Sequence, residues 1–181
     1  MDLFEALRKK RACRTFLKDP VPHAEIAQLA YAATRAPTAS NRPYRHCMLI
    51  DDPKVIRAVR LVSPSLLADP PLLLVIFTDL LVATERTGRV GEIAALVDSG
   101  AAGENVLLAA TALGLGSQFT MISTQAGIRV ILGLPEHSRV DVIIPLGFAD
   151  GPVRSVKTVP GANQIHHNQF GRHYGGIPAQ P

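Results

Sequence analysis

Hydrophobic and polar residues follow one another along this chain in blocks that predict helices interleaved with strands. Near the start, Asp2 and Glu5 have the spacing of a capping box, so a helix is expected over residues 3–10. A second helix is expected over residues 23–33, ahead of Pro37. The first helix would pack through Leu3, Phe4 and Leu7, and the second through Ile26, Leu29, Ala30 and Ala33.

Four apolar runs predict strands. The strongest covers residues 72–77, follows Pro70-Pro71 and is apolar at every position, which is typical of a strand covered on both faces. The polar stretch over residues 82–91 is assigned to no element. Three further strands are expected over residues 46–50, 117–121 and 140–146.

Helical patterns fill the intervals between the strands. An Asp-Pro pair at residues 52–53 is a helix-start signal. Residues 92–113 predict a long, alanine-rich helix in which Gly100 and Gly103 would let another helix or a cofactor ring come close. A further helix, capped by Thr124, is expected to end near residue 132.

Length and composition indicate one folded domain with a substantial core. The chain has 181 residues, of which 47% are hydrophobic and 19% charged. We expect residues 1–150 to form the domain. Residues 151–181 form a Gly/Pro/Asn/His-rich tail without a core pattern, which we expect to wrap onto a partner subunit.

The charge balance favours a small anionic ligand over a polymer. The net charge is +4, yet the basic residues form no long stripe and aromatic residues are only 5%, so no nucleic-acid partner is expected. Cys13 and Cys47 have no metal or disulfide spacing, which fits a reducing cytosol. With no signal-peptide pattern and an apolar run at residues 72–77 too short to span a bilayer, a cytoplasmic protein without membrane association is expected.

Three segments carry candidate chemistry, each with a plainer alternative. Lys10, Arg11 and Arg14 form a cationic cluster suited to a phosphate monoester, or merely complement the dipole of the first helix. The loop over residues 38–41 offers hydroxyl and amide groups to the polar edge of a flat ligand, or is an ordinary turn. Residues 117–121 would present backbone N–H groups to such a ring, or form a helix stop and a core strand.

Other chemistries lack the residues they need. The Gly-Leu-Gly-Ser at residues 114–117 ends a helix and opens none, so it is neither a dinucleotide fingerprint nor a P-loop. The His pair at residues 166–167 has no third ligand at metal spacing. Asp98 and Glu104 would lie on different helix faces and form no acid/base pair. Cys13 is expected to be buried and unreactive, the alternative being a pKa lowered by the neighbouring cations.

In their order along the chain, these segments resemble the nitroreductase-like flavoprotein family. The family's Arg-Arg-Ser-x-Arg pattern, with an aromatic residue two positions on, corresponds to Lys10-Arg11-Ala12-Cys13-Arg14-Thr15-Phe16. Its loop Ala-Pro-Ser-x-x-Asn-x-Gln-Pro-Trp corresponds to Ala36-Pro37-Thr38-Ala39-Ser40-Asn41-Arg42-Pro43-Tyr44. Further matches lie at residues 98–100, 114–117, 132–136, 145–148 and 165–171, so the resemblance covers nearly the whole chain.

The resemblance implies a three-layer α/β/α sandwich of the α+β class that binds FMN at the interface of an intertwined homodimer. The N-terminal cations would face the phosphate and ribityl chain, and the proline loop would approach from the partner subunit. A basic residue of the tail, Lys157 or alternatively Arg154, would complete the phosphate site. The implied cofactor-binding residues are Lys10, Arg11, Ala12, Arg14, Pro37, Thr38, Ala39, Asn41, Arg42, Phe119, Thr120 and Lys157.

The implied activity is that of an FMN-dependent oxidoreductase. Hydride would pass from NAD(P)H through flavin N5 to a small acceptor, such as a nitroaromatic, a quinone or an enone, in ping-pong fashion. No side chain is implied to be catalytic, because the flavin carries the chemistry. Ala12 replaces the motif's serine, and Arg42 lies in or near the place of a missing glutamine. Because of these departures, a protein of this fold that binds flavin, or no ligand, without catalytic turnover remains an alternative. A family member with different flavin chemistry is a second alternative.

Overall fold

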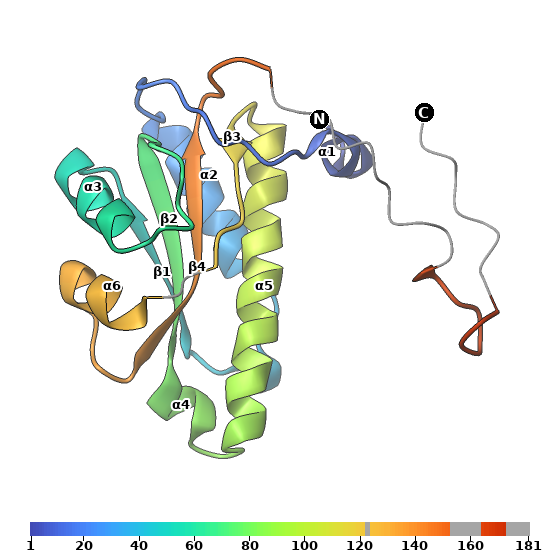
Figure 1. The fold of residues 1–181 in the computed structure, drawn as a ribbon. Coiled ribbons are helices and arrows are strands. Elements are labelled where there is room, and N and C mark those ends of the chain that lie inside the picture. Colours follow the sequence, from blue (N-terminus) through green and yellow to red (C-terminus); the bar gives the residue numbers. More distant parts are fainter. Residues whose placement is uncertain (122–123, 153–163, 173–181) are drawn as a thin grey trace.

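The computed structural model describes residues 1–121, 124–152 and 164–172. One antiparallel sheet, with helices on both of its faces, forms the body of the fold (Figure 1). The strand order is β1-β2-β4-β3. The strands are β1 (Arg45–Ile50), β2 (Leu72–Asp79), β3 (Gly116–Ser117) and β4 (Ser138–Gly147). The helices are α1 (Leu3–Lys9), α2 (His23–Thr34), α3 (Pro53–Leu61), α4 (Leu80–Thr84), α5 (Arg89–Ala112) and α6 (Gln125–Leu132), with a short 3₁₀ turn η1 (Ala39–Asn41).

The alternation of side chains along β2 creates the three layers. Leu72, Leu74 and Ile76 pack with α2 and α5 on one face of the sheet. Leu73 and Val75 point to the other face, where α3 and α6 cover them. Because both faces are covered, the uninterrupted apolar run of β2 is buried almost throughout, as the sequence predicts.

A bulge in β4 ties α5 to the sheet. Ile76 lies opposite Val142, but the next residue, Phe77, lies opposite Val140, so Asp141 is the extra residue. The buried Asp141 carboxyl accepts hydrogen bonds from the hydroxyls of Thr78 at 2.6 Å and Ser99 at 2.7 Å. The bulge therefore turns a polar side chain towards α5 and satisfies it there.

Helix α5 is the central helix of the fold. It has 24 residues. Among the helices that the structure describes, it is the one that is long and apolar enough to cross a membrane, judged by length and composition alone. It packs against both α2 and the sheet, and Ala102, Val106 and Ala110 are fully buried there. Such burial is that of a core helix.

Most predicted elements are confirmed, and four details are corrected. The strand expected over residues 117–121 is shorter and begins one residue earlier, because only Gly116 and Ser117 pair with β4 in a ladder. Thr120 pairs with β4 again at an isolated bridge to Ile143. The middle of that segment leaves the ladder where Phe119 turns onto Gly103 of α5. The unassigned residues 82–91 contain the end of α4 and the start of α5.

The other two corrections concern helix ends and faces. Asp2 caps α1 as expected, by accepting the Glu5 N–H at 2.8 Å. Thr124 precedes α6, but its side chain makes no capping hydrogen bond. The predicted apolar face of α1 does not pack into the core: Figure 1 shows α1 beside one end of α5, away from the sheet, and Ala6 is its buried residue. The side chains left exposed are Leu3, Phe4 and Leu7.

Candidate functional site

The basic segment after α1 lies beside β3. The Cys13 N–H donates to the Ser117 carbonyl at 2.8 Å, and Ala12 forms a parallel bridge with Ser117. Close approach is possible because residue 116 is glycine: a Cβ there would lie 2.6 Å from Cys13 Sγ. Tertiary structure thus pairs residues 12 and 13 of the basic segment with Ser117, the first residue of the candidate segment 117–121.

The three cations of this segment have different surroundings. The Lys10 ammonium lies 3.4 Å from a carboxylate oxygen of Glu104. The Arg11 guanidinium donates to the carbonyls of Arg8 at 2.6 Å and Lys10 at 2.7 Å, and so caps the end of α1. Arg14 is exposed. Arg11 therefore does what the plainer alternative predicts, whereas Lys10 and Arg14 project from the segment as side-chain cations.

Phe119 and Thr120 form a wall next to the basic segment. The Phe119 ring lies on Gly103 of α5 and is 38% exposed. Thr120 is buried, and its backbone N–H and C=O both pair with Ile143, at 3.0 and 2.9 Å. Its buried hydroxyl has no hydrogen-bond partner within the described residues. A buried hydroxyl without a protein partner is a group that a ligand or an ordered water can satisfy.

The proline loop is held at another part of α5. The Ala39 N–H donates to Asp98 Oδ2 at 2.7 Å, and the Tyr44 hydroxyl donates to the same oxygen. The Arg45 guanidinium donates to the carbonyls of Ala36 and Pro37, each at 2.8 Å. We call Asp98, Tyr44 and Arg45 the loop clamp, because their hydrogen bonds determine where the backbone of residues 36–39 lies.

The loop clamp supports a strained stretch of backbone. Ser40 and Asn41 have φ angles of 57° and 50°, in the left-handed region. Asn tolerates this region, but Ser adopts it less readily. Backbone strain of this kind persists only where the surroundings enforce it, and it is concentrated at functional sites.

Burial and the neighbouring Asp98 carboxyl raise the pKa of Tyr44 to about 12. Burial is the larger cause, and the hydrogen bond donated to Asp98 adds to it. The Tyr44 phenol is therefore a donor throughout the neutral range. From the sequence, Asp98 was a rejected acid/base partner and part of a motif match, and Tyr44 was part of the loop motif, but neither was predicted to hold the loop. The one available signal was an acidic residue within an Ala/Gly-rich helix.

Arg42 does not project freely from the loop. Its guanidinium pairs with Glu85, and its side chain is mostly buried while Glu85 is exposed. Thr38 is partly buried, and Pro37 and Asn41 are exposed.

One chain contains two groups of predicted site residues, and they lie apart. The first group, the basic segment with Phe119 and Thr120, is next to Gly103 and Glu104 of α5. The second group is the proline loop, which Asp98 holds. Six residues of helix separate Asp98 from Glu104, which is roughly 9 Å along the axis. Within the described residues, no hydrogen bond or ion pair joins the two groups. Lys157 and its alternative Arg154 lie outside the described residues.

Cysteine and metal chemistry find no support in the described part of the chain. Cys13 is buried, and burial raises the pKa of its thiol, so the alternative of a lowered pKa is wrong. No group of three or more metal-ligating side chains occurs in residues 1–121, 124–152 and 164–172.

Comparison with known proteins gives the family. The family model described as "Nitroreductase family" matches residues 7–63 and 57–148. The chain belongs to the nitroreductase family. It is 30% identical over 179 residues to an NADH dehydrogenase of Thermus thermophilus, covering 82% of this chain and 87% of that protein. It is 28% identical to a putative NADH dehydrogenase/NAD(P)H nitroreductase of Methanothermobacter thermautotrophicus over 159 residues, which cover 84% of this chain and 80% of the relative.

Solved structures confirm the nitroreductase fold. A putative NADH dehydrogenase/NAD(P)H nitroreductase from Parabacteroides distasonis superposes with a TM-score of 0.79 at 25% identity, covering 93% of this chain and 98% of the other. An FMN-dependent nitroreductase from Clostridium difficile superposes with a TM-score of 0.78 at 22% identity, covering 92% and 99%. The expected three-layer architecture is thereby confirmed.

Proposed function

We propose that this nitroreductase-family protein is an FMN-dependent oxidoreductase that uses NAD(P)H and a small acceptor such as a nitroaromatic, a quinone or an enone. When bound, FMN would supply the hydride-transfer chemistry between a reduced nicotinamide and the acceptor, through flavin N5 and in ping-pong fashion. The observation that carries the proposal is the pairing of Ala12 and Cys13 with Ser117, together with Lys10 at Glu104 and Phe119 at the adjacent Gly103. These contacts bring cations for a phosphate close to a wall for a ring.

The residues present fit a flavin. Lys10 and Arg14 supply positive charge for a phosphate, and Phe119 supplies an exposed aromatic wall. The unsatisfied hydroxyl of Thr120 supplies a hydrogen-bonding group. Glu104 beside Lys10 would be displaced from its ion pair or share the cation. Ala12, where the family motif has a serine, supplies only backbone groups.

We assign each group one task in the reaction. Lys10 and Arg14, with Lys157 or Arg154 of the tail, hold the phosphate. Phe119 and Thr120 orient the ring and exclude water from one side of it. Pro37, Thr38, Ala39 and Asn41 approach from the partner subunit, positioned by the loop clamp.

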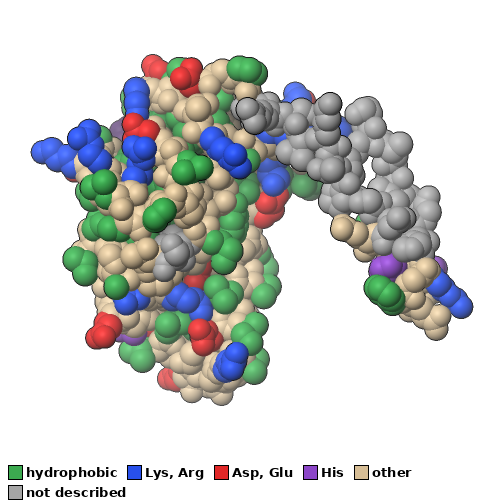
Figure 2. Space-filling view, in the orientation of Figure 1, with side chains coloured by type: hydrophobic (Ala, Val, Ile, Leu, Met, Phe, Trp, Pro, Cys, Tyr) green, Lys and Arg blue, Asp and Glu red, His purple; other side chains and the backbone are tan. Residues whose placement is uncertain are grey.

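A homodimer follows from the same proposal, because the two groups of site residues are apart in one chain. Large apolar side chains remain exposed on α5, visible as green side chains along its side of Figure 2. They are Val90, Ile93, Leu96 and Val97. Together with the exposed apolar face of α1, they form a surface suited to burial against a second copy. Strand β1 is at the edge of the described sheet, where a partner's tail over residues 151–181 can pack. We propose that this assembly acts in the cytoplasm.

The test is the visible absorption spectrum of the purified full-length protein, before and after adding FMN and then NADPH or NADH. A flavin band that bleaches with nicotinamide and returns on adding a quinone is the expected result. A bound flavin that no nicotinamide reduces would replace the proposal with a flavin-binding protein lacking turnover. Failure to bind flavin after reconstitution would overturn it altogether.

A further inference from the structure

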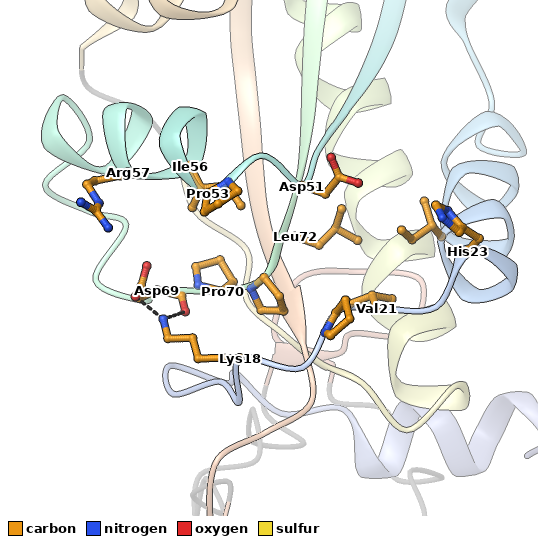
Figure 3. Close-up of a pocket in the computed structure, with 13 residues that line it drawn as sticks. Lys18, Val21, His23, Asp51, Pro53, Ile56, Arg57, Asp69, Pro70 and Leu72 are labelled. Atoms are coloured by element: carbon orange, nitrogen blue, oxygen red, sulfur yellow. Dashed lines mark hydrogen bonds and ion pairs between the residues drawn. The ribbon is translucent and has the colours of Figure 1, made fainter.

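A cavity lies at the end of the sheet where β1 finishes and β2 begins (Figure 3). Its volume is about 590 Å³, which is within the range of small-molecule sites. The first turns of α2 and α3 form two of its sides, and residues 18–21 and 69–71 close it. None of the flavin-binding residues proposed above lines this cavity, so it is separate from the proposed flavin site.

The walls of this cavity are stiff and apolar. Leu72 and Ile56 are buried beneath it, and Pro71 is packed from behind, since a Cβ on Gly147 would lie 2.6 Å from Pro71 Cδ. Proline rings have little freedom to lose, so the walls are largely formed before any ligand arrives. We call the cavity the proline pocket after four lining residues from three segments: Pro20, Pro53, Pro70 and Pro71.

One side of the proline pocket has an excess of positive charge. Asp69 pairs with Lys18, and with the Arg60 guanidinium at 2.7 Å. The hydrogen bond from Lys18, followed by the charges of Arg60, Lys18 and Arg57, lowers the pKa of the Asp69 carboxyl, which therefore stays ionised at neutral pH. A single carboxylate faces three cations. Arg57 lines the pocket, is exposed, and makes no hydrogen bond or close ion pair with any described residue.

The surrounding surface has the same charge bias. Figure 2 shows Lys and Arg side chains gathered over α3, whose sequence carries Lys54, Arg57 and Arg60. The other side of the pocket differs: Figure 3 shows Asp51 and His23 across the pocket from Arg57. The pocket is thus cationic at one end and apolar in the middle, and at the far end it carries the Asp51 carboxyl group and the His23 imidazole. An anionic group is therefore favoured only at the Arg57 end.

The charge and shape of the proline pocket indicate which class of ligand it would bind. A planar guanidinium binds a carboxylate through two parallel hydrogen bonds. The Arg57 guanidinium acts on Asp69 only at longer range, so its N–H donors are available to a ligand. A cationic ligand would be repelled by the excess charge, and a neutral ligand would leave Arg57 unused. Flat proline and aliphatic walls suit a ring or another flat apolar body. We propose that the proline pocket binds a small organic carboxylate with a flat apolar body, its carboxylate on Arg57.

The test compares two probes that differ only in charge, para-fluorobenzoate and para-fluorobenzamide, by fluorine NMR on the full-length protein. FMN is added first, so that any flavin site is filled. Saturable binding of the benzoate, with the benzamide weaker by roughly tenfold or more, is expected. Backbone amide shifts should be largest at residues 18–23 and 51–57. Shifts confined to Phe119 and the proline loop, or equal binding of both probes, would overturn the proposal.

Matched variants on one helix separate a specific contact from general attraction. Arg57→Gln should weaken para-fluorobenzoate roughly tenfold, whereas Lys54→Gln, which removes an equal charge that does not line the pocket, should change it less than about twofold. Equal losses in both variants, or none in either, would refute a site at Arg57. Circular dichroism and thermal melting check that both variants fold. The flavin spectrum is recorded on the same samples, so a failure of the proposed oxidoreductase function is seen separately.

Discussion

Gly103 of α5 lies against the ring of Phe119, so closely that a Cβ at residue 103 would be 2.5 Å from Phe119 Cε2. The ring can turn away, because it is partly exposed and belongs to a segment that has left the β3–β4 ladder. The small residue in the helix therefore decides where the aromatic wall of the proposed flavin site lies.

We expect Gly103→Ala to weaken flavin binding with little change in stability. Alanine favours the helix by up to about 1 kcal/mol, which offsets the cost of moving the ring. The displaced ring would enter the space proposed for the flavin and raise the FMN dissociation constant roughly tenfold. Fluorescence titration measures that constant. In a Phe119→Ala background the same change should add nothing, and an undiminished effect there would contradict the explanation.

Removing the Tyr44 hydroxyl tests the loop clamp. Tyr44→Phe takes away the hydrogen bond to the buried Asp98 and should lower the free energy of unfolding by about 1–2 kcal/mol. Tyr31→Phe is the control, because Tyr31 is exposed, and should stay within about 0.5 kcal/mol. Urea denaturation gives both values. If the loop clamp positions the flavin-facing loop, Tyr44→Phe also weakens flavin binding; an unchanged flavin affinity would count against that role.

The raised pKa of Tyr44 predicts a loss of stability in alkali. The phenol ionises near pH 10 in the unfolded chain and near 12 in the folded one. The folded state holds the proton more tightly, so its contribution is complete below pH about 10 and is lost between about 10 and 12. Absorbance titration of tyrosinate should show one late-titrating group. That group, and its part of the stability loss, should be missing in Tyr44→Phe.

The ion pair between Lys10 and Glu104 predicts opposite effects of two substitutions on FMN. Lys10→Gln should weaken FMN binding by roughly threefold to tenfold, because one phosphate cation is lost. Glu104→Gln should strengthen it by a few-fold, because the competing carboxylate is gone. Riboflavin, which has no phosphate, should bind nearly alike to all three proteins. Parallel changes for FMN and riboflavin would show that neither residue acts through the phosphate.

If the exposed apolar side of α5 forms the dimer interface, a single charged substitution there should dissociate the dimer. Val97→Lys should convert a dimer to a monomer at micromolar concentration, because the lysine would be buried against the second copy. Leu61→Lys on α3 is the control, since Leu61 is 81% exposed but lies outside α1 and α5. Multi-angle light scattering reads the mass, and flavin absorbance should fall with dissociation. A Val97→Lys protein that remains dimeric and retains flavin would place the interface elsewhere.

The local pattern of apolar residues was sufficient to predict those elements whose burial follows directly from their own sequence. Strand β2 reads as an uninterrupted apolar run, and both of its faces are covered. Helix α5 reads as an alanine-rich block, and its small residues face α2 and the sheet. The order of the motifs also gave the family, because contacts with a common ligand constrain residue types at particular positions.

The same local pattern failed where contacts between distant segments decide. The apolar face of α1 reads as a core face, yet nothing in the described chain covers it. The sequence left Arg11 either a phosphate ligand or a partner of the helix end, and in this structure its guanidinium donates to the carbonyls at the end of α1. In both cases, the sequence records the type of side chain and not the group that it meets.

The sequence by itself determined the strand and helix periods, the covered central strand and the membership of the nitroreductase family, because each is a property of residues in order. Tertiary structure alone placed Asp98 beneath the proline loop, 54 residues after Tyr44, and Gly103 beneath Phe119. It also separated the two groups of site residues along α5 and formed the proline pocket. These contacts depend on how α5 crosses the sheet and on the bulge at Asp141, which are set by the packing of the whole chain.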